Sequence, residues 1–310
     1  MMTARVSTIV FGEVLVDEAP SGHAVGGAPF NVARHLAAFM APPLMITRIG
    51  DDRNGAAVRA EFEHFVIPEA GLQIDPMEET GRAVAERSQR YTLLPRQAYD
   101  FIDPARAAAS VAGGDHDLVY FGTLAQREER SRLALAAVLE NTRAKRFLDL
   151  NLRSGHANEA IVTKSLTAAD VVKVNEEELQ ALFQWYFQIG PNDPPLATEE
   201  VHAACRALMD RFSLEALIVT LAHRGSVYFG ADGGYIATRD NPVPPFVIDT
   251  TGAGDAFAAI FLLGTARGWP LELTLSRANE FAGAICAVTG AVPGDIGFYD
   301  KWVARWRQGA

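Results

Sequence analysis

The sequence predicts an α/β protein, built as a three-layer α/β/α sandwich around a mainly parallel central sheet, with a small β-lid beside it. Two observations support this fold class. Short apolar runs rich in β-branched residues recur along the chain, and segments with helical spacing of apolar residues separate them. Short apolar strands that alternate with helices are typical of parallel sheets whose two faces are both covered.

The expected elements follow one another in a regular order. The predicted strands are Val6–Phe11, Leu44–Ile49, Asp117–Phe121, Arg146–Leu150, Asp170–Val174 and Ala216–Leu221. The predicted helices are Phe30–Phe39, Gly55–Phe65, Glu128–Glu140, Asn158–Ala168, Glu176–Phe187 and Glu199–Arg211. Open sheets of this kind bind ligands beyond the carboxyl ends of their strands, so we expect functional residues there.

Two segments interrupt the alternation, at about residues 13–28 and 82–100. Both are extended in character and too polar for a buried central strand. The second could form a hairpin with its turn at Arg87–Gln89. We expect the two segments to form the β-lid of a single domain that covers residues 1–310; ordinary surface loops are the alternative.

Composition excludes several classes of function. The net charge is −10 without any block of Lys or Arg, so we expect no nucleic-acid partner. None of the lysines (Lys145, Lys164, Lys173 and Lys301) stands in a P-loop motif. No apolar run reaches the length of a membrane span, and the two cysteines, Cys205 and Cys286, suggest reduced buried thiols, so we expect a cytoplasmic protein.

The strongest local signal is Asp249–Asp255, with the sequence Asp-Thr-Thr-Gly-Ala-Gly-Asp. The run that follows is apolar on every side and ends at Gly268-Trp269-Pro270, which indicates a helix buried in the core. The first N–H groups of a helix lack partners and carry the positive end of its dipole. Because Gly252–Gly254 has only small side chains, a ligand could approach these groups closely.

This geometry suggests an anion hole for a transferring phosphoryl group, with the Asp255 carboxylate accepting the proton of an attacking hydroxyl. Phosphoryl transfer depends mainly on positioning and charge stabilisation, so a modest base suffices. A glycine-rich turn in which Asp255 only caps the helix is the alternative.

The same segment strongly resembles the C-terminal signature of the ribokinase-like (PfkB) carbohydrate kinases. A second signature of that family is matched by Gly26-Gly27-Ala28-Pro29-Phe30-Asn31 and, further on, by Arg48-Ile49-Gly50-Asp51-Asp52. Phe121–Gln126, Asp149–Arg153 and Asn175–Glu178 are similar to further family segments and occur in family order. The resemblance covers nearly the whole chain and is strongest to bacterial fructokinase-like members, which implies the ribokinase-like fold.

The resemblance also implies roles for individual residues. Asp255 corresponds to the catalytic base, and Gly252, Ala253 and Gly254 correspond to the anion hole. The residues implied to bind substrate are Asp17, Gly27 and Asn31, which would hold sugar hydroxyls, and Arg153, which could contact phosphate or an acidic substrate or be a surface salt-bridge partner.

For the cofactors, the resemblance implies ATP and Mg²⁺, and K⁺ in some members. The residues implied for the nucleotide are Asn175, Glu178, Thr220, Gly225 and Asn279, and Glu178 would arrange Mg²⁺ through water. Asp249 and Thr251, with Gly290, resemble the monovalent-cation site. Ala222 departs from the family, which often has glycine there, and could crowd the nucleotide loop.

The implied activity is an ATP-dependent sugar kinase that phosphorylates a primary hydroxyl, and the motifs favour fructose. 2-Keto-3-deoxygluconate, another sugar or a nucleoside is the alternative within the family. An alternative of another class is a catalytically idle relative that binds a sugar or nucleotide. Because an isolated small sheet has exposed edges, we also expect a homodimer in which two lids pair.

Overall fold

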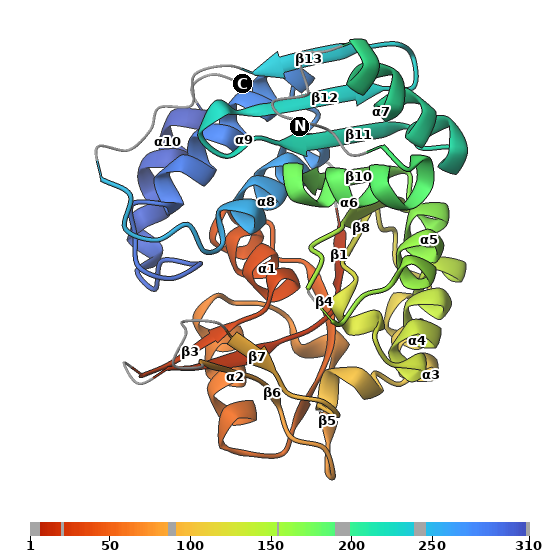
Figure 1. Cartoon of the computed structure of the whole chain (residues 1–310). Helices are drawn as coiled ribbons and strands as arrows, with labels where there is room; N and C mark the ends of the chain where they lie inside the picture. The colour runs from red at the N-terminus through yellow and green to blue at the C-terminus, as the bar shows by residue number, and fades with distance from the viewer. Residues whose placement is uncertain are drawn as a thin grey trace.

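The computed structural model describes residues 7–19, 22–85, 91–153, 155–189, 199–238 and 246–307. Its main sheet has nine strands in the order β13-β12-β11-β10-β9-β8-β1-β4-β5 (Figure 1). The strands are β1 Thr8–Phe11, β4 Leu44–Gly50, β5 Leu72–Asp75, β8 Leu118–Phe121, β9 Lys145–Asp149, β10 Val171–Asn175, β11 Ala216–Thr220, β12 Ser226–Gly230 and β13 Tyr235–Thr238.

The sheet is parallel from β5 to β11, and only β12 and β13 join it in antiparallel pairs. All six predicted strands are present within a residue or two of the expected bounds. Their carboxyl ends therefore lie along one edge of the sheet, which is where parallel sheets bind ligands. Strands β5, β12 and β13 were not expected from the sequence.

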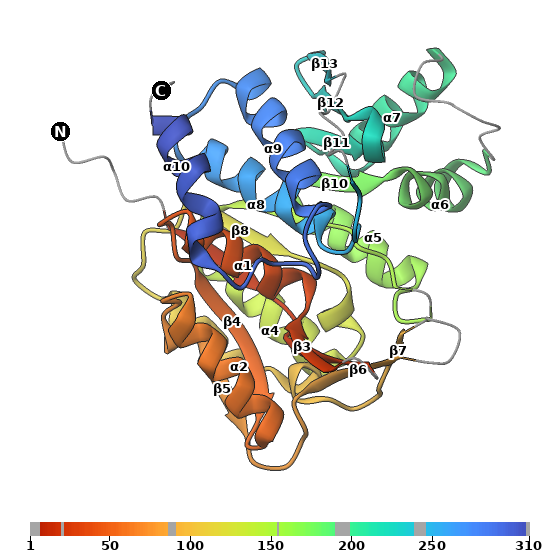
Figure 2. The same ribbon diagram turned by 90° about the vertical axis from the view of Figure 1, so that its left-hand side faces the viewer.

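Helices cover both faces of the sheet, as predicted. One face packs against α3 Pro104–Val111, α4 Glu129–Glu140, α5 Glu159–Ala168, α6 Glu176–Phe187 and α7 Glu199–Phe212. The other packs against α1 Ala28–Ala38, α2 Arg53–His64, α8 Ala253–Ala266, α9 Leu271–Ile285 and α10 Asp300–Arg307. Figure 1 shows the first set on the right of the sheet and the second on the left, and Figure 2 shows the layers from the side.

Helix α8 is the central helix of its layer. It is buried continuously from Ala256 to Gly264, packs against both α1 and α9, and places the Phe261 ring 5.6 Å from the Phe147 ring of β9. A helix without a polar face can exist only where it is covered on every side. Its amino end then lies at the carboxyl edge of the sheet.

A second, smaller sheet follows directly from the end of β1. It has the order β3-β2-β6-β7, with β2 Leu15–Ala19, β3 Gly22–Gly26, β6 Gly81–Ala85 and β7 Tyr91–Leu93. Both expected lid segments contribute to it, and β6 and β7 pair antiparallel, as a hairpin would. The expected turn at Arg87–Gln89 lies outside the described residues. The segment Ala98–Phe101 forms a short 3₁₀ helix and not a strand.

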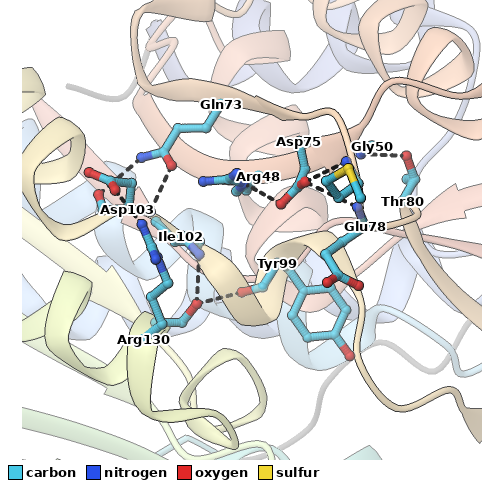
Figure 3. A network of polar contacts seen from close by, with 12 residues as sticks. Arg48, Gly50, Gln73, Asp75, Glu78, Thr80, Tyr99, Ile102, Asp103 and Arg130 are labelled. Atoms are coloured by element: carbon cyan, nitrogen blue, oxygen red, sulfur yellow. Dashed lines mark hydrogen bonds and ion pairs between the residues drawn. The ribbon is translucent and has the colours of Figure 1, made fainter.

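Polar contacts anchor this smaller sheet to the edge of the main one (Figure 3). Just before β6, the Thr80 amide donates to Asp52 (2.7 Å), and the Thr80 hydroxyl accepts from the Gly50 amide at the end of β4 (2.9 Å). Arg48 forms a buried ion pair with Asp75 at 2.8 Å. Asp52 thus serves as the N-cap of α2 and also fixes the residue that precedes β6.

No helix in the described ranges combines the length and the apolar character required to cross a bilayer.

Candidate active site

The amino end of α8 opens the candidate site. Gly252 caps the helix with a φ of 79°, and a Cβ at this position would lie 2.5 Å from the Cα of Ala291. Only glycine can therefore make this tight, left-handed entry to the helix. Asp255 follows in the first turn, so Gly252, Ala253, Gly254 and Asp255 come together at the helix dipole as the sequence predicted.

Asn31 of α1 holds the carboxyl group of Asp255. Asn31 Nδ2 donates to Asp255 Oδ2 at 2.7 Å, although 224 residues separate them in the chain. The amide oxygen of Asn31 accepts from Arg34, whose guanidinium also pairs with Glu61 at 2.9 Å. Both ends of the Asn31 side chain are thus engaged, and the amide group is fixed with its nitrogen toward Asp255.

The electrostatic surroundings suit Asp255 to proton transfer. Desolvation raises its pKa from 3.8 to about 6, with a further contribution from the negative charge of Asp149. The Asn31 hydrogen bond and the positive charges of Lys173 and Arg153 act in the opposite direction. A carboxyl group with this pKa is ionised at neutral pH and remains basic enough to accept a proton from an attacking hydroxyl.

A buried ion pair, which the sequence reasoning missed, lies beside this helix end. Lys173 Nζ donates to Asp149 Oδ1 at 2.9 Å, and the two residues are register neighbours on β10 and β9. The ammonium lies 3.4 Å from where a Cβ on Gly254 would sit, so the pair borders the amino end of α8. A signal was available, since Lys173 is the one charged residue in the apolar run Val171–Val174.

Asn175 and Glu178 form a capping box at the start of α6. The Glu178 amide donates to Asn175 Oδ1 (2.8 Å), and the Asn175 amide donates to the Glu178 carboxylate (2.9 Å). The second Glu178 oxygen accepts from the Leu152 amide at 2.8 Å. Glu178 thus connects the loop after β9 to the first turn of α6.

Thr220, Gly225 and Asn279 lie at the far end of the sheet. Thr220 ends β11, and Gly225, with a φ of 95°, is the last residue of the turn that leads into β12. Asn279 of α9 donates to Ser226 (2.9 Å) and Thr238 (2.7 Å), and so fastens α9 to β12 and β13. These three residues share one region, next to the carboxyl end of β10 and its residue Asn175.

Ala222 adopts a left-handed conformation, with a φ of 52°, in the turn between Thr220 and Gly225. This conformation is the reason a glycine suits the position, because a Cβ strains the backbone there. Alanine occupies this left-handed position in the turn between Thr220 and Gly225.

Asp249, Thr251 and Gly290 also come together as expected. The Asp249 carboxylate accepts from the Thr251 amide at 2.9 Å and from the Gly290 amide at 3.2 Å. Desolvation opposes these bonds, yet the net effect is a lowered pKa, so the carboxylate is charged at neutral pH. The segment is therefore a charged turn at the entrance to α8.

Asp17, Gly27 and Arg153 lie on the side of the smaller sheet. Burial raises the pKa of Asp17 to about 6, and the charges of Arg153 and Arg34 oppose this shift. Gly27 caps α1 with a φ of 103° and lies against the backbone of Glu13. The charge of Arg153 acts on Asp17, Glu13 and Asp255 alike, so this guanidinium lies among the carboxyl groups of the site.

The donor chemistry of the site fits a nucleotide and its magnesium ion. The charges of Asp149, Glu178 and Asp255 all act on Lys173, which places hard carboxylate oxygens around one cation. Mg²⁺ prefers such oxygens together with phosphates and water. Within the described residues, no group of three or more His, Cys, Asp or Glu could hold a metal by itself.

The fold and this site define a phosphotransferase: an α/β enzyme with a buried carboxyl group at the amino end of a buried helix. The model of the pfkB family carbohydrate kinase matches residues 3–295, and the chain belongs to this family. A curated fructokinase from Klebsiella pneumoniae is 29% identical over 280 residues, which cover 83% of this chain and 83% of that protein.

Solved structures share the fold. An aminoimidazole riboside kinase from Salmonella enterica, complexed with aminoimidazole riboside and an ATP analog, matches 96% of this chain and 99% of that one, with a TM-score of 0.78 and 22% identity. A fructokinase from Vibrio cholerae, bound to fructose, ADP and potassium ion, matches 95% and 96%, with a TM-score of 0.77 and 21% identity. The sequence-based prediction of a ribokinase-like kinase is confirmed.

Proposed function

We propose that this sugar kinase transfers the γ-phosphoryl group of ATP to a primary hydroxyl of fructose. The observation that carries the proposal is the Asp255 carboxyl group, held by Asn31 at 2.7 Å at the amino end of α8. That arrangement places a base next to the positive end of a helix dipole. Both features favour the attack of a hydroxyl on a phosphoryl group.

In this proposal each part of the site has one task. Asp255 accepts the proton of the attacking hydroxyl, and Asn31 fixes its orientation. The amides at Gly252–Gly254 and the ammonium of Lys173 stabilise the negative charge that develops on the transferring group. Asp17, Gly27 and Arg153 contact the sugar from the side of the smaller sheet.

The nucleotide would lie against the carboxyl ends of β10 and β11. Thr220, Gly225 and Asn279 would border it, and Asn175 with Glu178 would face its phosphates. Mg²⁺, held by phosphate oxygens, water and the carboxylates near Lys173, would neutralise charge on the phosphates. Asp249, Thr251 and Gly290 would hold K⁺ beside the entrance to α8.

Fructose is favoured because the fructokinase of Klebsiella pneumoniae matches most of the chain. The second candidate is an acidic sugar such as 2-keto-3-deoxygluconate, which the exposed guanidinium of Arg153 favours. We further propose a cytoplasmic homodimer in which the edges of two smaller sheets pair.

The test is ADP release by the purified protein with ATP and Mg²⁺, offered fructose, tagatose, ribose, 2-keto-3-deoxygluconate or adenosine. Fructose should give the highest kcat/KM. Asp255→Asn should lower kcat with fructose by several orders of magnitude, because the base is removed while the shape is kept. Turnover that is unchanged in Asp255→Asn contradicts the mechanism, and ligand binding without ADP release from any sugar would identify an idle relative.

A further inference from the structure

Arg34 lies on α1, one turn after Asn31, and the mechanism above gives it no task. Its side chain is only 7% exposed, although arginine is rarely buried without a partner. The guanidinium lies 5.0 Å from the ring centre of Phe30 and 5.8 Å from that of Phe65, and the buried Nε has no hydrogen-bond partner among the described residues. The group is therefore confined, and a change of partners would leave further buried donors unsatisfied.

The two terminal nitrogens of Arg34 donate to acceptors from three elements. Nη1 donates to Glu61 Oε2, on α2, at 2.9 Å. Nη2 donates both to the carbonyl oxygen of Val25, on β3, at 2.8 Å and to Asn31 Oδ1, on α1, at 2.7 Å. Because one nitrogen of a planar group serves both acceptors, a displacement of Val25 moves the donor that holds Asn31. Figure 1 shows α1 between α8 and the smaller sheet, where such a connection is possible.

The two acceptors of Nη2 lie next to different parts of the proposed site. On one side, Asn31 Nδ2 donates to Asp255 Oδ2 at 2.7 Å. On the other side, the carbonyl acceptor comes one residue before Gly26, and a Cβ on Gly26 would lie 3.0 Å from Asp17 Oδ2. Hydrogen bonds therefore connect the strand that borders the Asp17 carboxyl group with Asp255, and the guanidinium is the central member of this connection.

Stability alone does not explain a buried arginine at this position. Among the described residues Glu61 is its one acidic partner, and the Glu61 side chain is 30% exposed, so the ion pair gains little against the cost of burying the guanidinium. An apolar side chain in such a place is often equally stable. It would supply no donor for Asn31, however, and the free amide could rotate and turn its oxygen toward the Asp255 carboxylate, where two acceptors repel each other.

We propose that Arg34 is a positioning residue that ties the orientation of the proposed base to the strand of the smaller sheet that borders Asp17. Through Asn31 it keeps an amide nitrogen directed at the Asp255 carboxylate, and through Val25 it holds β3 against α1. The inference rests on the proposed function, since it concerns the base and the sugar side of the same site. Its loss should therefore act on the rate through Asn31 and on sugar binding through β3.

The experiment is a double-mutant cycle with Arg34→Met and Asn31→Ala, in which kcat and KM for fructose are measured. Methionine keeps much of the length of the side chain and supplies no donor. In the wild-type background Arg34→Met should lower kcat by about tenfold, which corresponds to the loss of one hydrogen bond. In the Asn31→Ala background the same substitution should change kcat by less than about twofold, because the amide through which it acts is absent.

The KM for fructose reports the other end of the connection. Arg34→Met also removes the 2.8 Å bond to the Val25 carbonyl, so β3 and the neighbouring Asp17 are held less firmly. KM should therefore rise by about threefold, and it should do so in both backgrounds, because this effect does not pass through Asn31.

Two further variants separate positioning from a folding defect. Arg34→Lys keeps a positive charge beside Glu61 but lacks the planar fork, so it should still lower kcat by about threefold or more. The matched control is Arg146→Met near the amino end of β9, which removes another partly buried arginine that donates to two main-chain carbonyls, those of Leu139 and Ala168. This control should lower Tm and keep the wild-type kcat and KM.

Equal losses of kcat from Arg34→Met in the two backgrounds overturn the inference, as does a wild-type kcat in Arg34→Lys. An unchanged KM in both backgrounds overturns the connection to β3. A wild-type enzyme that releases ADP with none of the sugars contradicts the proposed function instead, so the two kinds of failure are distinguishable.

Discussion

Replacing Asn31 with alanine should move the pH dependence of catalysis to higher pH. Asn31 donates to the Asp255 carboxylate at 2.7 Å, and this hydrogen bond opposes the desolvation that raises the pKa of Asp255 to about 6. A hydrogen bond to a charged group contributes about 1.5–3 kcal/mol, and about 1.4 kcal/mol corresponds to one pH unit. Because water can enter in place of the amide, we expect the acid limb of kcat/KM to move upward by about one pH unit.

The assay is ADP release at limiting fructose from pH 5 to pH 9, for the wild type and Asn31→Ala. The wild-type rate should fall below about pH 6, where Asp255 becomes protonated. The control is Asn158→Ala, which removes the N-cap of α5 and its 3.0 Å bond to the Ile161 amide, far from the base. That variant should lose about 1 kcal/mol of stability and keep the wild-type pH profile.

An equal loss of activity at every pH in Asn31→Ala, with the wild-type midpoint retained, would contradict this role of Asn31. Such a result would show that Asn31 only holds the sugar and does not tune the base. Activity that recovers at pH 8 but not at pH 6 would support the assignment.

Three further substitutions test the frame around the base. Asp255→Asn should raise the free energy of unfolding, measured with urea, by at most about 3 kcal/mol at pH 8 and by very little at pH 4. The reason is that folding raises the pKa of Asp255 from 3.8 to about 6, so the wild type loses stability as the pH rises through this range and the carboxyl group becomes charged. Lys173→Met should lower the free energy of unfolding by about 3–5 kcal/mol, because it leaves Asp149 buried without its ion-pair partner. Adding Asp149→Leu should restore much of this loss in the same unfolding assay. Gly252→Ala should lower both Tm and kcat, because its Cβ would meet Ala291 at 2.5 Å; a fully stable, active variant would refute the tight-turn assignment.

The elements of the main sheet could be predicted from the sequence because each is determined locally. Short runs rich in β-branched residues, such as Ala216–Thr220, favour buried strands when helical segments alternate with them. The end strands β12 and β13 were not predicted. They join the sheet in antiparallel pairs, which departs from the strand–helix alternation on which the prediction relied.

The sequence by itself determined the fold class, the family resemblance and the glycine-rich entry to α8, since these depend on short stretches of chain. Only the tertiary structure decided which groups meet. The register of β9 and β10 pairs Asp149 with Lys173, and the packing of α1 on α8 places Asn31 against Asp255 from 224 residues away. The same packing buries Glu13 beneath Gly27. Periodicity shows which face of an element is buried but not which element covers it, and the pKa of a carboxyl group depends on that cover. For this reason the proposed base was visible in the sequence at Asp249–Asp255, while the charges that shift its pKa were not.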